Sequence, residues 1–92
     1  MRLTVLGCAG SFPGPEAACS AYLVEADNFR LLLDFGTGSL GPLQRYAGLT
    51  SIDAILLSHL HGDHIFDACS YVVVRRYAPG GPYPPIPVCF NS

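Results

Sequence analysis

The stretch that decides the fold is the apolar segment Ile55-Leu56-Leu57-Ser58 followed by His59-Leu60-His61-Gly62-Asp63-His64. The apolar run begins at Ile52, and a nearly continuous run of this length is typical of a buried central strand. All three histidines of the chain fall within the six residues that follow it. We call residues 59–64 the histidine turn. It places three imidazoles and one carboxylate at the mouth of a predicted strand.

The spacing inside the histidine turn divides its polar side chains into two pairs. His59 and His61 are two residues apart, so they can point to the same side as the backbone leaves the strand. Gly62 allows a sharp turn, after which Asp63 and His64 enter the start of a helix. Zinc and similar ions take imidazole nitrogen and carboxylate oxygen, so each pair can serve one ion. The alternative is a polar loop whose histidines only donate hydrogen bonds to nearby carbonyls.

The histidine turn by itself does not complete two metal sites. Each ion needs at least three protein ligands, and the turn offers about two for each. The chain has no further histidine, and its other carboxylates are spread over predicted strands and helices. The sequence therefore predicts an incomplete ligand set.

Strands dominate the first part of the predicted secondary structure. Two runs separated by Asp27-Asn28 form a predicted hairpin, because both residue types tolerate left-handed backbone. Gly41-Pro42 opens a short helix that Gly48 ends. The β-branched run Val72–Val74 makes a strand a competitor for the last part of the long helix. The expected strands cover residues 3–6, 20–26, 29–34, 52–58 and 86–90, and the expected helices cover residues 42–47 and 64–77.

The composition predicts a surface that something else covers. Hydrophobic residues make up 50% of the chain and charged residues only 13%, against roughly 25% in an average soluble domain. The alternative is a tight monomer whose surface is rich in Gly, Ser and Pro. The net charge of -2 gives no electrostatic footprint for non-specific nucleic-acid binding. The net charge does not exclude an RNA substrate, because bound metal ions could supply the positive charge.

The cysteines and the apolar segments predict a cytoplasmic protein without membrane attachment. The segment Val5-Leu6-Gly7-Cys8 resembles a lipoprotein cleavage site, but the apolar core before it is too short for a signal peptide. No run approaches the roughly 20 apolar residues of a membrane span. The four cysteines lack a C-x-x-C pair, so we expect reduced thiols, with a disulfide framework as the alternative.

The histidine turn resembles the His-x-His-x-Asp-His signature of the metallo-beta-lactamase superfamily. Leu6-Gly7 and the segment Leu33-Asp34-Phe35-Gly36-Thr37-Gly38 resemble the opening segments of its ribonuclease Z and cyclic-nucleotide phosphodiesterase branch. This resemblance implies an α/β fold: the N-terminal half of an αβ/βα sandwich, with one mixed β-sheet and flanking helices. Residues 1–92 would then be a partial domain that lacks the second sheet and the remaining ligands. The segment Phe66-Asp67-Ala68-Cys69 departs from the ribonuclease Z pattern and favours the phosphodiesterase relatives.

The resemblance also implies a role for each matching residue. His59 and His61 would bind a first metal ion, and Asp63 and His64 a second. Asp63 would also orient the attacking water. Asp34 would be a buried residue that braces the histidine turn, or else only a turn aspartate at the end of a strand. The implied cofactors are two divalent ions, zinc first, with manganese or iron as alternatives.

Three functions follow from these observations. The first is hydrolysis of a phosphodiester, in a cyclic nucleotide or RNA, by metal-bound hydroxide. The second is a catalytically incomplete half-domain that binds metal weakly, or that associates with itself or another chain through an uncovered sheet face. The third is a small zinc-stabilised binding module, which would need closed ligation involving a cysteine such as Cys69.

Overall fold

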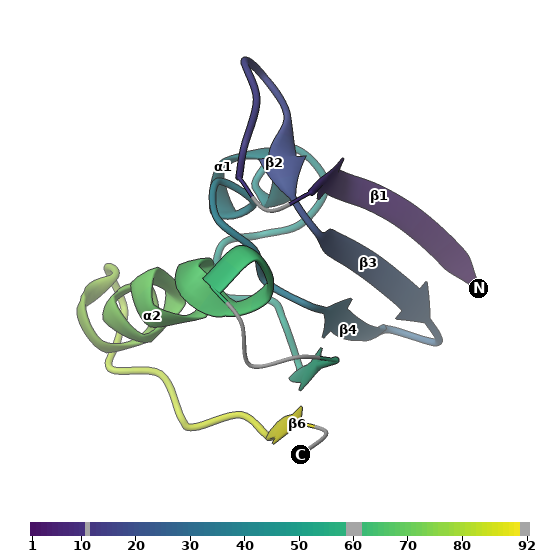
Figure 1. Ribbon diagram of the computed structural model, residues 1–92. Coiled ribbons are helices and arrows are strands. Elements are labelled where there is room, and N and C mark those ends of the chain that lie inside the picture. Colours follow the sequence, from purple (N-terminus) through teal and green to yellow (C-terminus); the bar gives the residue numbers. More distant parts are fainter. Residues whose placement is uncertain (11, 59–61, 91–92) are drawn as a thin grey trace.

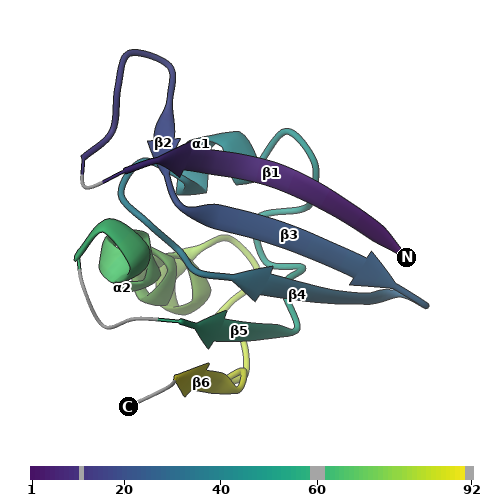
Figure 2. The ribbon, with the colours of Figure 1, turned by 45° about the vertical axis from the view of Figure 1, so that its right-hand side comes forward.

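A mixed sheet of six strands, in the order β2-β1-β3-β4-β5-β6, organises the chain (Figures 1 and 2). The computed structural model describes residues 1–10, 12–58 and 62–90. Strand β3 is antiparallel to both of its neighbours, β1 and β4, whereas β1 is parallel to β2, and β4, β5 and β6 run parallel to one another. The elements are β1 (Arg2–Ala9), β2 (Ala18–Cys19), β3 (Ala21–Ala26), β4 (Phe29–Leu33), α1 (Leu40–Leu43), β5 (Ala54–Leu57), α2 (Gly62–Tyr77) and β6 (Val88–Phe90).

The hairpin between β3 and β4 confirms the prediction made from Asp27 and Asn28. These two residues have φ angles of 49° and 65°, and Ala26 pairs with Phe29 across them. A two-residue hairpin turn of this kind requires positive φ at both positions, which Asp and Asn adopt more readily than most residues. The turn therefore fixes the register of the two strands.

Both helices lie on one face of the sheet, which we call the inner face (Figures 1 and 2). Leu23, Leu32 and Ile55 form one row across β3, β4 and β5 on this face, and each is at most 3% exposed. Phe35 and Tyr71 cover them, with ring centroids 5.4 Å apart. Burial of such side chains stabilises the fold by about 1.5–3 kcal/mol each. The core therefore sits between the sheet and α2.

The opposite face of the sheet, which we call the outer face, corrects the prediction for β5. The apolar run predicted a strand buried on both faces. In the structure Ile55 and Leu57 are buried, whereas Leu56 between them is 42% exposed. Successive side chains of a strand point to opposite faces, and no described helix lies over the outer face (Figure 2). The run is apolar throughout, yet only half of it is covered by described residues.

Helix α2 extends through the β-branched run Val72–Val74. The prediction of a helix there is therefore confirmed, and the alternative of a strand is wrong. Arg75 and Arg76 lie in its last turn, where cations are favoured. The first helix was predicted over residues 42–47, but α1 covers only Leu40–Leu43. The residues from 44 to Ala47 form turns, with hydrogen bonds such as that from Ala47 N–H to Leu43 O. Neither of the two helices in the described part of the chain is long and apolar enough to cross a membrane.

The first strand also differs from its prediction, because β1 continues through Gly7 to Ala9 instead of ending there. Its pairing with both β2 and β3 shifts register at Gly7. A Cβ added at this position would meet the backbone carbonyl oxygens of Cys19 and Ala18, the latter at 2.6 Å. Gly7 is therefore required by a close approach of two backbones, not as a strand terminator.

Replacing Gly7 by alanine should lower the free energy of unfolding by about 2–3 kcal/mol, because the backbone of residues 18 and 19 must move. Gly10→Ala is the matched control, since a Cβ there would meet nothing within 4 Å. It should change stability by less than about 0.5 kcal/mol. Urea unfolding of both variants checks this expectation. Equal midpoints for the two variants would contradict the packing described at Gly7.

Candidate metal site

The candidate site forms where β4 and β5 end side by side. These strands are parallel neighbours, so their carboxyl ends meet at the same edge of the sheet. Asp34 follows β4 directly, and its backbone N–H donates to Leu56 O at 2.8 Å. Ser58 follows β5, and His64 lies in the first turn of α2. Three segments of the chain therefore bring polar side chains to one edge, where ligand sites of open sheets commonly occur.

The Asp34 carboxylate joins these segments. Its Oδ1 accepts the backbone N–H of Ser58 at 2.7 Å. The Ser58 hydroxyl lies 2.7 Å from Oδ2 and 3.0 Å from Oδ1. His64 Nδ1 lies 3.0 Å from Oδ2. Oδ1 thus accepts from Ser58, which follows β5, and Oδ2 contacts both Ser58 and His64 of α2.

Burial and hydrogen bonding shift the pKa of the Asp34 carboxyl group in opposite directions. Asp34 is 6% exposed, and burial alone would raise its pKa. Hydrogen bonds from the Ser58 N–H, the Ser58 hydroxyl and the His64 ring outweigh burial, so the pKa of Asp34 is lowered overall. The carboxylate is therefore ionised at neutral pH and acts only as an acceptor.

Backbone conformation holds the carboxylate in place. Asp34 has a φ of 61°, a left-handed conformation that Asp tolerates better than most residues. Phe35 N–H then donates to His64 O at 2.7 Å, and Asp67 N–H donates to Phe35 O at 3.0 Å. The segment that leaves β4 is thus bonded directly to the first turn of α2. Asp34 is thus a strand-end residue with a left-handed backbone that also contacts His64, and its role in bracing metal ligands stays a prediction.

Two residues that sequence reasoning did not select contribute to this arrangement. In the sequence Ser58 marks only the end of the apolar run, but in the structure it supplies two of the donors to Asp34. Asp67 is one of the carboxylates outside the histidine turn, within the segment that departs from the ribonuclease Z pattern. Its Oδ2 accepts the N–H of Leu40, the first residue of α1, at 2.7 Å. The position of Ser58 directly before the histidine turn could have identified it as a site residue. The contact of Asp67 with Leu40 spans 27 residues, and no local sequence pattern indicates it.

Two of the predicted metal ligands, His59 and His61, lie outside the described residues. Asp63 is the second residue of α2, and its side chain also lies outside what the structure describes. Asp34 and His64 are the predicted site residues whose side chains are described, and they are in contact. Among the described side chains, no group of three or more His, Cys, Asp or Glu residues converges.

The described side chains of Asp34 and His64 are arranged as a zinc ligand and its carboxylate partner often are. A carboxylate that accepts from one nitrogen of an imidazole fixes the ring, and the other nitrogen then binds the metal in many zinc sites. Because Asp34 occupies Nδ1 of His64, Nε2 is the nitrogen through which this residue would bind an ion. The side chain of His64 is 20% exposed, so an ion could reach it. Imidazole nitrogen suits zinc, manganese and iron alike.

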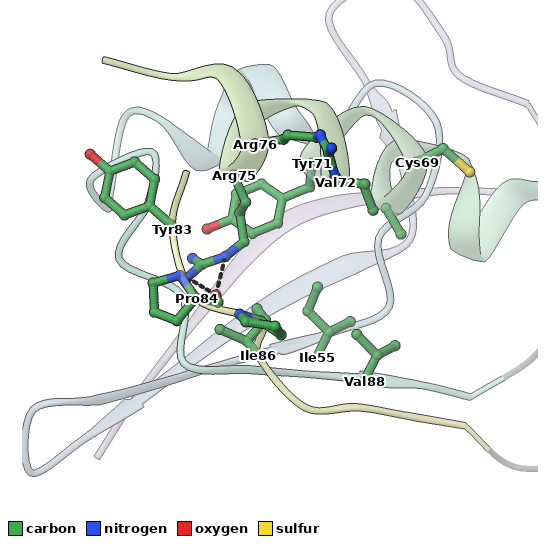
Figure 3. Close-up of a pocket in the computed structure, with 12 residues that line it drawn as sticks. Ile55, Cys69, Tyr71, Val72, Arg75, Arg76, Tyr83, Pro84, Ile86 and Val88 are labelled. Atoms are coloured by element: carbon green, nitrogen blue, oxygen red, sulfur yellow. Dashed lines mark hydrogen bonds between the residues drawn. The ribbon is translucent and has the colours of Figure 1, made fainter. Parts of the chain in front are cut away.

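A separate cavity of about 480 Å³ lies between α2 and the proline-rich segment that leads to β6 (Figure 3). Val72 and Arg75 line it from α2, and Ile55 and Ile86 line it from the sheet side. The Arg75 guanidinium donates to Pro84 O at 2.7 Å and to Thr50 O at 3.2 Å. Of the predicted site residues whose side chains the structure describes, neither Asp34 nor His64 lines this cavity. Arg75 therefore links the proline-rich segment to α2.

The sequence and the fold both match known proteins. The profile of the metallo-beta-lactamase superfamily matches residues 14–84. An uncharacterized protein of Mycobacterium leprae is 52% identical over 83 residues, which are 89% of this chain and 29% of that protein. The fold resembles the metallo-beta-lactamase fold protein YhfI of Bacillus subtilis, with a TM-score of 0.77 and 38% identity over 79% of this chain and 30% of the other.

The human short-form tRNase Z is also similar, with a TM-score of 0.73 and 30% identity over 78% of this chain and 28% of the other. These structures confirm the predicted α/β fold with one mixed sheet and flanking helices. The chain spans slightly under a third of the length of each of these three relatives.

Replacing Asp34 by asparagine tests the brace without disturbing the backbone, because Asn also tolerates left-handed φ. The new amide would face the Ser58 N–H with a donor or a weaker acceptor, so we expect the free energy of unfolding to fall by about 2 kcal/mol. Asp27→Asn is the matched control, since Asp27 also has positive φ but is exposed. It should change stability by less than about 0.5 kcal/mol in the same urea experiment. Equal stability of the two variants would show that Asp34 does not brace the site.

Proposed function

Because the chain belongs to the metallo-beta-lactamase superfamily, we propose that its histidine turn supplies metal ligands for the hydrolysis of a phosphodiester. The observation that carries this proposal is the contact between the Asp34 carboxylate and His64 Nδ1 at 3.0 Å. It fixes the orientation of one imidazole of the turn, and oriented imidazoles are what a hydrolytic metal site requires. Phosphodiester substrates are favoured by the similarity to tRNase Z.

In this proposal the described residues position and hold the ligands. The ionised Asp34 accepts from Nδ1 of His64, which keeps the proton on that nitrogen and directs Nε2 toward the ion. Ser58 holds Asp34 in turn, through its N–H and its hydroxyl. Two divalent ions, when bound, would lower the pKa of a water molecule and stabilise negative charge on the phosphate. His59, His61 and Asp63 would supply the other ligands of the turn, and Asp63 would orient the water.

The proposal includes two kinds of phosphodiester substrate, RNA and a cyclic nucleotide. RNA is favoured by the relationship to tRNase Z. A cyclic nucleotide is favoured by Asp67, which stands where the ribonuclease Z pattern has a glycine-containing turn and which here binds the start of α1. The net charge of -2 provides no general attraction for RNA, so recognition of either substrate would depend on the bound ions.

A second candidate function is that of a half-domain that binds metal without turning over substrate. The feature that favours it is the histidine turn itself, whose four side chains His59, His61, Asp63 and His64 offer about two ligands for each of two ions. The ligands of the histidine turn would then bind an ion weakly, because a catalytic site needs at least three protein ligands per ion. Metal affinity and activity together separate the two functions.

We expect the purified chain to bind zinc in a calorimetric titration, and Asp34→Asn to weaken that binding by about 10–100-fold, as loss of such partners does in other zinc sites. Asp27→Asn, the same change at an exposed turn, should leave the affinity unchanged. His61→Ala should abolish tight binding. Zinc affinity that is the same in all four proteins would contradict the ligand assignment.

The same proteins are then assayed for hydrolysis of bis-p-nitrophenyl phosphate, a cyclic nucleotide and a short RNA in the presence of zinc or manganese. Metal-dependent hydrolysis that is lost in His61→Ala is the result expected for the enzyme. Hydrolysis that survives His61→Ala would refute the proposed site. Zinc binding without hydrolysis of any of the three substrates would favour the half-domain.

A further inference from the structure

The start of α1 is capped by a residue from a distant part of the chain. Ser39 precedes this helix, and a serine there commonly accepts a hydrogen bond from an N–H group of the first turn. The Ser39 side chain makes no such bond, and its hydroxyl donates to Gly36 O at 2.6 Å. The N–H of Leu40 donates instead to Oδ2 of Asp67 on α2, at 2.7 Å. One helix thus supplies the capping oxygen of the other.

The first part of α2 contacts both ends of the segment 34–40. The His64 side chain contacts Asp34 at the beginning of this segment, and the Asp67 side chain contacts Leu40 at its end. Residues three apart are neighbours on the surface of a helix, so His64 and Asp67 lie on the same side of α2. A shift of this part of α2 against the segment would therefore change both contacts together.

Backbone hydrogen bonds attach the segment 34–40 to the sheet on its other side. Gly36 N–H donates to Ser20 O at 3.0 Å. Cys19 N–H donates to Thr37 O at the same distance. The segment therefore lies between α2 and the connection from β2 to β3. If the contact with the Asp67 side chain were lost, the segment would stay bonded to the sheet, and α2 would be the element free to shift.

We propose that Asp67 is a positioning residue of the candidate metal site. Its carboxylate holds the first part of α2 against the segment 34–40, which keeps His64 Nδ1 within hydrogen-bond distance of Asp34. A metal ligand has to be held within about 0.5 Å of its productive position, so a small shift of α2 would misplace the ring. The role of His64 as a ligand rests on the proposed function, whereas the orientation of its ring can be measured without metal.

The chain offers a matched control for Asp67 at the opposite edge of the sheet. Asp53 precedes β5, so it lies at the end of this strand away from the candidate site. Its Oδ2 accepts the backbone N–H of Arg30 at 2.8 Å, across 23 residues. Both aspartates are half-buried, and each also donates its own N–H to a backbone carbonyl. Replacing either by alanine should therefore lower the urea midpoint by a similar amount, so stability alone does not distinguish them.

The tautomer of the His64 ring distinguishes them, and ¹⁵N NMR of the metal-free proteins at about pH 8 reports it. In the wild type the proton should be on Nδ1, which contacts Asp34. In Asp67→Ala the ratio of the Nδ1 to the Nε2 tautomer should fall about fivefold, as expected when one hydrogen bond of ordinary strength is lost. Asp53→Ala should keep the wild-type ratio. Asp67→Asn keeps an acceptor oxygen and should restore most of the preference.

An equal ratio in Asp67→Ala and the wild type would overturn the proposal, and so would equal changes in Asp67→Ala and Asp53→Ala. If Asp67→Ala does not fold, Asp67→Glu replaces it, with Asp53→Glu as its control. The longer side chain keeps the charge but cannot keep the same position of its oxygen against Leu40 N–H. The same comparison of ratios then decides.

A calorimetric zinc titration of the same proteins separates this proposal from the proposed function. Asp67→Ala should weaken zinc binding by about 10-fold, the lower end of the effect of residues that orient a ligand. Asp53→Ala should bind zinc as the wild type does. A wild type that binds no zinc would refute the proposed function, and the tautomer ratios would still decide whether Asp67 positions His64. Zinc binding weakened equally in both alanine variants would show a general effect of stability and would overturn the role of Asp67.

Discussion

The hydrogen bonds of the Asp34 carboxylate are the interaction on which the candidate site depends. They join the end of β4, the end of β5 through Ser58, and the first turn of α2 through His64. The parallel pairing of β4 and β5 makes this possible, because it brings both strand ends to one edge. The same edge would receive the remaining ligands of the histidine turn. The geometry of the proposed metal site is thus a consequence of strand direction.

The local features of the fold were predictable because short-range chemistry determines them. Asp27 and Asn28 predict a tight hairpin, since few other residues adopt positive φ at low cost. Helix α2 was predictable from its apolar spacing and from the arginines near its end, although its β-branched run left a strand open. The histidine turn and the family resemblance pointed to Asp34 as well. Its contact with His64 agrees with the brace that the resemblance implied, and its role in metal binding stays a prediction.

The features that sequence reasoning missed all involve contacts between distant segments. Gly7 lies within β1 and not at its end, because the constraint on it comes from the backbone of residues 18 and 19. Asp67 binds the start of α1 across 27 residues, and no local pattern reports such a contact. Apolar periodicity identifies which faces are hydrophobic but not what covers them, so Leu56 was expected to be buried and is exposed. The apolar composition is reflected in the exposed side chains of Leu3, Val5 and Leu56 on the outer face, and what covers that face stays a prediction.

The most direct test of the contact between Asp34 and His64 is the tautomer of the His64 ring, observed by ¹⁵N NMR at about pH 8, where an ordinary imidazole is neutral. We expect Nδ1 to carry the proton, because it donates to Asp34, and we expect added zinc to shift the Nε2 resonance. Asp34→Asn should reduce the preference for this tautomer. A proton on Nε2 in the metal-free protein, or zinc bound through Nδ1, would contradict the arrangement on which the proposed site is built.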